Sequence, residues 1–134
     1  MGGRGRLRLL LDTHALIWWT EGSDRLGERA AGEIARSANE VFVSAVSAME
    51  IATKFRLGKL PQARILAEAF EEQVHAEAFV PLPVTMTHGR VAGSLQIPHR
   101  DPFDRLLIAQ AMLEDLILVS NEGGFDAFGV RRLW

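Results

Sequence analysis

The chain has 134 residues, of which 48% are hydrophobic and 24% charged, and its formal net charge is −2. This length predicts one domain, residues 1–134, with a sizeable buried core. The near-balanced charge excludes a globally basic nucleic-acid-binding surface, so any such surface must be a local patch. Cysteine is absent, which excludes disulfides and thiolate metal sites and is typical of a reducing cytoplasm.

The N-terminal segment does not have the pattern of a signal peptide or a membrane anchor. It is basic, Met-Gly-Gly-Arg-Gly-Arg, but the apolar run behind it is only Leu9–Leu11. A membrane-spanning helix needs about 20 apolar residues. We therefore expect a cytoplasmic protein that does not engage a membrane.

Short apolar strands alternate with helical segments along the chain. Strands are expected at residues 7–11, 41–43, 78–82, 116–119 and 130–133. Helices are expected at residues 14–20, 25–38, 45–57, 64–76, 85–94 and 102–112. This alternation predicts an α/β fold in which helices cover both faces of a short, mostly parallel central sheet, as a three-layer α/β/α sandwich.

Four acidic residues occupy related places in this pattern. Asp12 and Glu122 each follow the end of a buried strand, and Glu50 lies within two turns of the end of another. Asp104 lies in the first turn of the helix that Asp101 is expected to cap. Because ligands bind beyond the carboxyl ends of parallel strands, we expect these acids to gather at one edge of the sheet.

Each acid taken alone also has a structural explanation. Asp12 can cap the helix after it, and Asp104 belongs to an N-terminal capping arrangement. The run Ser-Ala-Met-Glu at 47–50 fits a capping box, and Glu122 fits an ordinary loop.

Three observations favour a functional site when the acids are taken together. Ser44 is an equally good cap, and its use leaves Glu50 in mid-helix with no capping role. Apolar segments crowd the acids, which a cap does not require. Two carboxylates ~5 Å apart repel by about 3 kcal/mol at an effective dielectric near 20. Repulsion among several carboxylates is relieved by a bound cation or by protonation of a carboxylate whose pKa is raised.

The side chains available limit the kind of metal. Sites built only from carboxylate oxygens suit Mg²⁺ or Mn²⁺, whereas zinc prefers His or Cys. The four histidines show no i, i+4 ligand spacing. No phosphate-binding GxxxxGK[ST] loop and no G-x-S-x-G nucleophile motif occurs.

Five segments carry a resemblance to a known family. They are Leu-Leu-Leu-Asp-Thr-His-Ala at 9–15, Ser-Ala-Val-Ser-Ala-Met-Glu-Ile at 44–51, Lys-Phe-Arg-Leu-Gly-Lys-Leu at 54–60, Arg-Asp-Pro-Phe-Asp-Arg-Leu-Leu-Ile-Ala-Gln-Ala at 100–111 and Leu-Val-Ser-Asn-Glu at 118–122. In order and spacing they resemble a PIN domain, and more narrowly the VapC-type toxins of bacterial toxin–antitoxin pairs.

The resemblance implies a PIN-like fold and a Mg²⁺-dependent endoribonuclease, with Mn²⁺ as a second possible cofactor. It implies that Asp12, Glu50 and Asp104 are catalytic metal ligands. It also implies that Glu122 is the fourth catalytic acid. Glu122 falls where the family usually has Asp and is longer by one methylene, so it is not counted among the metal ligands. Polar positions that support such a site are matched by Thr13, Ser47, Ser120 and Asn121.

The implied partners are RNA, a cognate antitoxin and a second copy of the chain in a homodimer. The cations best placed for RNA are Lys54, Arg56, Lys59, Arg100 and Arg105. An antitoxin groove is expected between the helices at 45–57 and 64–76. Its candidate apolar walls are Ile51, Phe55, Leu66 and Phe70, some of which must instead belong to the core.

Two other functions stay open. One is a haloacid-dehalogenase-type phosphatase, which needs Asp-x-Asp after the first strand, where this chain has Asp12-Thr13-His14. The other is a degenerate PIN-like module that binds RNA or protein without cleavage, for which Glu122 is the sequence support.

Overall fold

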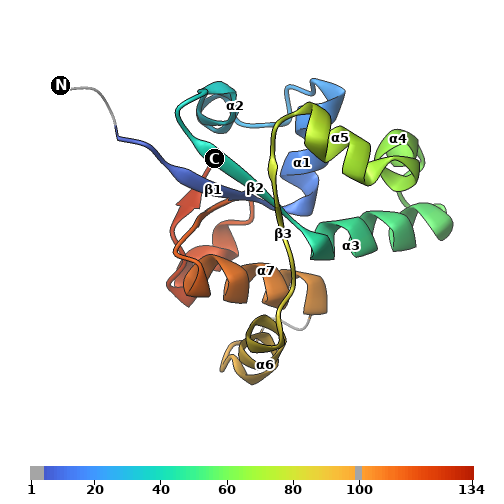
Figure 1. Ribbon diagram of the computed structural model, residues 1–134. Coiled ribbons are helices and arrows are strands. Elements are labelled where there is room, and N and C mark those ends of the chain that lie inside the picture. The colour runs from blue at the N-terminus through green and yellow to red at the C-terminus, as the bar shows by residue number, and fades with distance from the viewer. Residues whose placement is uncertain (1–4, 99–100) are drawn as a thin grey trace.

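Parallel strands form the centre of the computed structural model, which describes residues 5–98 and 101–134 (Figure 1). The strands are β1 (Arg8–Leu11), β2 (Glu40–Ser44), β3 (Val80–Leu82), β4 (Ile117–Val119) and β5 (Arg132–Leu133). Their order across the sheet is β3-β2-β1-β4-β5, and every pair is parallel. The α/β fold with a parallel sheet is therefore confirmed, and β1 lies at its centre.

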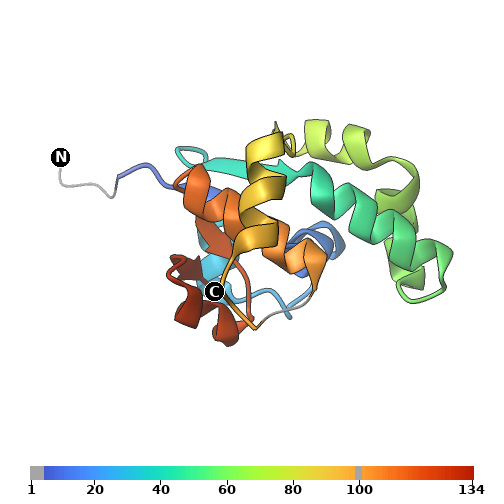
Figure 2. The same ribbon diagram turned by 90° about the horizontal axis from the view of Figure 1, so that it is seen from below.

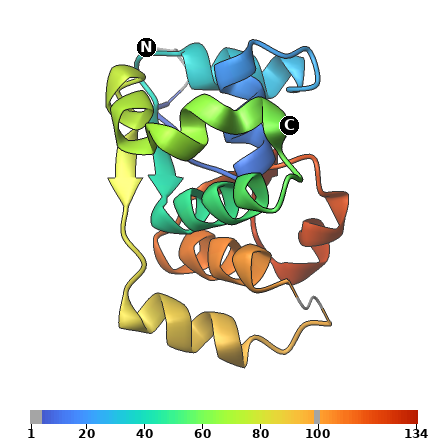
Figure 3. The ribbon, with the colours of Figure 1, turned by 90° about the vertical axis from the view of Figure 1, so that its right-hand side faces the viewer.

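Helices cover both faces of this sheet. They are α1 (Thr13–Glu21), α2 (Glu28–Ala35), α3 (Ala45–Arg56), α4 (Arg64–Glu68), α5 (Phe70–Ala76), α6 (Met86–Ser94) and α7 (Pro102–Leu113), with the short 3₁₀ helices η1 (Pro61–Ala63) and η2 (Gly123–Phe128). Helices α1 and α2 lie on one side of the sheet, and α7 lies on the other with α6 outside it (Figures 1 and 2). Helix α3 lies beside α7 (Figure 3).

The alternation of side chains along β1 divides the interior into two cores. Leu9 and Leu11 face α1 and α2, whereas Leu10 faces α7 together with Leu118. All four are fully buried. Complete burial of one leucine side chain contributes about 1.5–3 kcal/mol, so these strands anchor both helical layers.

Two expected helices differ from the structure. The helix expected at 64–76 is broken at Ala69, which adopts φ −137° and ψ 46° between α4 and α5. No glycine or proline marks that break. Helix α2 spans only Glu28–Ala35 of the helix expected at 25–38, and Trp134 packs against Gly27, the N-cap of α2. A Cβ at Gly27 would lie 2.8 Å from the Trp134 backbone, so the chain end requires glycine at this position.

Candidate functional site

A cavity of about 130 Å³ opens at the carboxyl ends of β1 and β4. Among the described residues, five carboxylates line it: Asp12, Glu50, Asp101, Asp104 and Glu122. They come from the ends of β1 and β4, from α3 and from the start of α7. The structure thus brings together the four acids that the strand pattern selected.

Asp12 is both a helix cap and a member of the cavity. Its carboxylate accepts a hydrogen bond of 2.8 Å from the Ala15 amide, and its own amide donates to the Val119 carbonyl at 3.0 Å. Only 8% of the residue is exposed. Burial raises the pKa of Asp12 to about 6, against the hydrogen bonds from Ser120 and Ala15, and the Asp104 charge raises it further.

Glu50 is buried, and both of its carboxylate oxygens are engaged. Oε1 accepts from the Thr13 hydroxyl at 2.6 Å, and Oε2 accepts from the Lys54 ammonium at 2.5 Å. The Thr13 hydroxyl also lies 3.0 Å from the Ser47 hydroxyl. Because the hydrogen of Thr13 goes to Glu50, Ser47 donates to Thr13. A relay from Ser47 through Thr13 therefore orients Glu50.

The capping explanations are resolved by these contacts. Ser44 caps α3 by accepting from the Val46 amide at 3.0 Å, so the capping-box interpretation of Glu50 is wrong. Asp101 does cap α7, accepting from the amides of Phe103 and Asp104 at 2.9 and 3.3 Å. Capping and membership of the cavity coexist at Asp12 and at Asp101.

Glu122 and Asn121 form the more open side of the cavity. Both are exposed and follow β4 after the single residue Ser120. Buried Ser120 accepts from the Glu122 amide at 3.0 Å and also hydrogen-bonds Asp12. Of the predicted supporting residues, Thr13 and Asn121 line the cavity, while Ser47 and Ser120 act from behind it.

Three lining residues were not assigned to the site from the sequence: His14, Asp101 and Phe125. Asp101 was expected only as a cap. Its spacing of three residues from Asp104 was the available signal, because residues three apart share a helix face.

Lys54 lines the acidic cavity itself. Burial on its own would lower the pKa of Lys54. The hydrogen bond and charge of Glu50, followed by the charges of Asp101 and Asp104, outweigh burial and raise it. This lysine is a charged member of the site and not merely a surface cation.

The other predicted RNA-binding cations are placed differently. Arg56 and Lys59 are exposed at and just beyond the end of α3. Arg105 donates to backbone carbonyls of residues 92–97, which gives its guanidinium a structural role. Arg100 lies outside the described residues.

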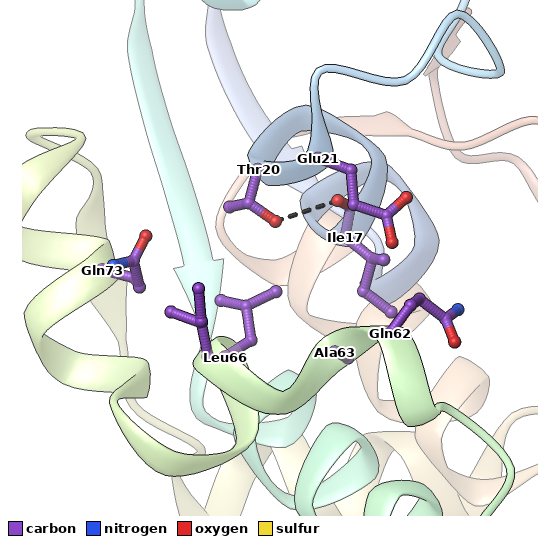
Figure 4. Close-up of a pocket in the computed structure, with 8 residues that line it drawn as sticks. Ile17, Thr20, Glu21, Gln62, Ala63, Leu66 and Gln73 are labelled. Carbon is purple, nitrogen blue, oxygen red and sulfur yellow. Dashed lines mark hydrogen bonds between the residues drawn. The ribbon is translucent and has the colours of Figure 1, made fainter.

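Two of the four candidate walls of the antitoxin groove, Ile51 and Leu66, are buried in the core, whereas Phe70 does line a groove between α3 and α5. A separate hollow of about 200 Å³ lies between α1 and the η1–α5 segment (Figure 4). Thr20 donates to the Ile17 carbonyl at 2.9 Å beside it, and Glu21 is the carboxylate among its described lining residues. It has no acidic cluster and is separate from the site.

A larger apolar groove of about 570 Å³ lies between α3, α5 and β3. Phe70 lines it, as do Ala45 and Ala48 of α3. Because an α-helix turns about 100° per residue, these alanines lie on the opposite side of α3 from Glu50 and Lys54. The groove and the acidic cavity are therefore two separate surfaces.

A sequence model described as the PIN domain matches residues 9–130. The chain belongs to the PIN domain family. No curated protein matches it significantly. No helix in the described part of this PIN domain has the length and apolar character needed to cross a membrane.

Several solved structures are similar to this PIN domain, and one of them is described as a toxin–antitoxin complex. FitAcB from Neisseria gonorrhoeae matches at 16% identity and TM-score 0.64, over 94% of this chain and 96% of that chain. VapBC2 from Rickettsia felis, bound to a DNA fragment from its promoter, matches at 12% identity and TM-score 0.62, over 95% and 98%. A toxin–antitoxin complex from Klebsiella pneumoniae matches at 17% identity and TM-score 0.60, over 90% and 92%. At these identities the likeness establishes the fold.

PIN domains typically use divalent metal ions, and the donor set here fits a hard cation. The carboxylate oxygens of the cavity are the ligands that Mg²⁺ and Mn²⁺ prefer. The Lys54 ammonium against Glu50 shows that a cation is accepted in this cavity. Among the described residues, no three acidic or histidine side chains converge closely enough to hold an ion as they stand.

Proposed function

We propose that this PIN domain is a Mg²⁺-dependent endoribonuclease that acts as the toxin of a toxin–antitoxin pair. The observation that carries the proposal is the meeting of Asp12, Glu50, Asp104 and Glu122 in one cavity at the carboxyl edge of a PIN-type sheet. The similar structure described as a toxin–antitoxin complex supports the biological role.

Asp12, Glu50 and Asp104 would hold the ion, with Mn²⁺ as an alternative to Mg²⁺. A bound divalent cation would supply Lewis acidity for water activation and neutralise charge on the phosphate in the transition state. The chain's own residues fix this donor set. Ser120 orients Asp12, and the Ser47–Thr13 relay orients Glu50. A cavity carboxylate then accepts the proton of the attacking water, and the products carry a 5′-phosphate and a 3′-hydroxyl.

The RNA backbone would approach from the end of α3. Arg56 and Lys59 are exposed there, close in sequence to the cavity-lining Lys54. Cations that neutralise phosphates make affinity fall as salt rises. We expect this local patch, and not the net charge, to bring RNA to the acidic site in the cytoplasm.

The proposed protein partners are an antitoxin and a second copy of the chain. An antitoxin would block cleavage by placing a basic side chain among the carboxylates. A guanidinium suits this role because its planar fork can engage two carboxylates and is weakly hydrated.

A second candidate is a PIN-like module that binds RNA or protein without cutting. It is favoured by Glu122, which is exposed and stands where the family usually has Asp. A phosphatase of the haloacid dehalogenase type is disfavoured, because the matched family is the PIN domain and position 14 is histidine.

The testing experiment compares RNA cleavage by the wild type, Asp104→Asn and Glu72→Gln with Mg²⁺ present. Glu72 is an exposed acid on α5 and serves as the matched control. We expect Asp104→Asn to lose about 100-fold or more in rate, the scale of losing one charge-stabilising group, while Glu72→Gln cleaves normally. Full activity of Asp104→Asn would exclude this site. A Mg²⁺ titration followed by heat release, with no cleavage by the wild type, would favour the binding module.

A further inference from the structure

We propose that Lys54 is a built-in counter-cation that competes with the divalent ion for Glu50 and thereby sets the metal affinity of the site. The inference rests on the proposed function, because it concerns the same cavity. It goes further by assigning the lysine a role in metal binding in the absence of RNA.

The first support is the contact itself. Lys54 lies four residues after Glu50 on α3, and its ammonium is 2.5 Å from Glu50 Oε2. The Glu50 side chain is 5% exposed and that of Lys54 31%, so the pair is unlike a solvated surface ion pair. Surface pairs contribute little, but removing one partner of a buried pair leaves an uncompensated charge. Removal of the Lys54 charge would therefore leave the Glu50 carboxylate buried without its ionic partner.

The second support is that each Glu50 oxygen already accepts a hydrogen bond, and the donor at one of them carries a positive charge. Thr13 occupies Oε1 and Lys54 occupies Oε2. A carboxylate that ligates Mg²⁺ must offer at least one of these oxygens. Thr13 is itself held by Ser47 inside the protein, whereas Lys54 reaches the cavity on a long, flexible and partly exposed side chain. Lys54 is therefore the partner that the ion displaces.

The third support is the charge of the cavity. Within the described lining, Lys54 is the lysine that faces the five carboxylates, with His14 as the other basic side chain. Loss of its charge removes both a direct competitor at Glu50 and a repulsive charge beside the ion. Both effects act in the same direction and strengthen Mg²⁺ binding.

Replacing Lys54 by an uncharged residue should destabilise the metal-free protein, although it strengthens Mg²⁺ binding. Without Lys54, the buried Glu50 charge keeps the Thr13 hydrogen bond but loses its ionic partner. We expect the metal-free Lys54→Met protein to melt at a lower temperature than the wild type. Mg²⁺ should then raise its melting temperature by more than it raises that of the wild type, since tighter binding to the folded state adds stability.

The test is a calorimetric titration with Mg²⁺ alone, without RNA, on the wild type, Lys54→Met and Lys59→Met. Lys59 supplies the matched control because it is exposed, is not among the cavity-lining residues, and its loss changes the net charge equally. We expect Lys54→Met to bind Mg²⁺ about tenfold or more tightly than the other two, the size of one displaced charge–charge contact. Equal or weaker binding by Lys54→Met would overturn the inference.

A second variant covers the case in which Lys54→Met does not fold. Lys54→Gln retains a donor for Glu50 without the charge, and we expect it also to bind Mg²⁺ more tightly than Lys59→Met. If Lys54→Gln binds no more tightly, the lysine is not a competitor. RNA cleavage by the wild type is measured in parallel. If the Lys54 variants bind Mg²⁺ more tightly than the wild type but the wild type does not cleave RNA, the nuclease function is rejected and the role of Lys54 is retained. If the affinities are equal and the wild type cleaves RNA, the role of Lys54 is rejected and the nuclease function is retained.

Discussion

Asp12 combines a helix cap with a carboxylate whose burial raises its pKa from 3.8 to about 6. Below 3.8 this residue is protonated in both the folded and unfolded states. Between 3.8 and about 6 the folded state binds more protons, so stability falls as pH rises through this window. At about 1.36 kcal/mol per pKa unit, the loss reaches about 3 kcal/mol above the folded-state pKa.

This loss predicts a pH-dependent effect of Asp12→Asn. Asparagine keeps the cap on α1 but has no charge to desolvate. Without metal, we expect the variant to be more stable than the wild type by up to about 3 kcal/mol at a pH well above 6, and equally stable below 3.8. Urea unfolding across this range measures the difference, with exposed Glu72→Gln as control. A stability gap that does not change with pH would show that burial of the charge is not its cause.

At the scale of elements, the docking of α6 on α7 positions the mouth of the site. Arg105, one residue after the cavity-lining Asp104, donates to carbonyls at and beyond the end of α6: Ala92 at 2.9 Å, Ile97 and Gly93 at 3.3 Å, and Leu95 at 2.7 Å. The last carbonyls of a helix have no intrahelical donors. Arg105 therefore joins the end of α6 to the first turn of α7.

We expect Arg105→Met to lower the free energy of unfolding by about 2 kcal/mol, because it leaves these carbonyls without their donor. Arg90→Met is the control, since Arg90 is an exposed arginine of α6. Denaturant unfolding measures the stability, and a filter-binding assay well below the melting temperature measures RNA affinity. We expect that affinity to match the control. Weaker RNA binding with unchanged stability would instead restore Arg105 as an RNA contact.

The elements predicted from sequence were those with local signals. Strands β1 and β4 are continuous apolar runs, and the cap at Asp101 follows from Asp-Pro at a helix start. Because the sheet is parallel, these two patterns also placed Asp12, Asp104 and Glu122 at one edge. The break at Ala69 lacked a local signal. It depends on the packing of segments distant in the sequence.

The remaining site contacts required three-dimensional information. Spacing alone allowed Lys54 to pair with Glu50 or to point to solvent, since residues four apart share a helix face in either case. The Thr13 hydroxyl reaches Glu50 only because β1 and β2 are neighbours, across a separation of 37 residues. Pattern analysis thus selected the acids, and the family resemblance named Thr13, Ser47 and Ser120 as supporting residues. Which acid each of them contacts required the structure.

At the scale of the whole molecule, charge is unevenly distributed. The net charge is −2, yet five carboxylates line one cavity, and the exposed cations Arg56 and Lys59 lie at the end of α3. A polyanion such as RNA is repelled by the first feature and attracted by the second. A cationic inhibitor is attracted by the carboxylates and repelled by the cations. Lys54 already shows how a basic side chain contacts Glu50.

This balance predicts how a basic antitoxin segment would act. A peptide that combines a short amphipathic helix with one arginine should inhibit cleavage and compete with Mg²⁺, because both cations need the same carboxylates. The same peptide with glutamine in place of arginine is the matched control and should inhibit more weakly. Competition should weaken as salt rises, since part of the attraction is screened. Fluorescence polarisation at increasing Mg²⁺ measures the apparent affinity. If saturating Mg²⁺ leaves that affinity unchanged, the peptide does not occupy the acidic cavity and inhibits through the RNA path or a dimer interface.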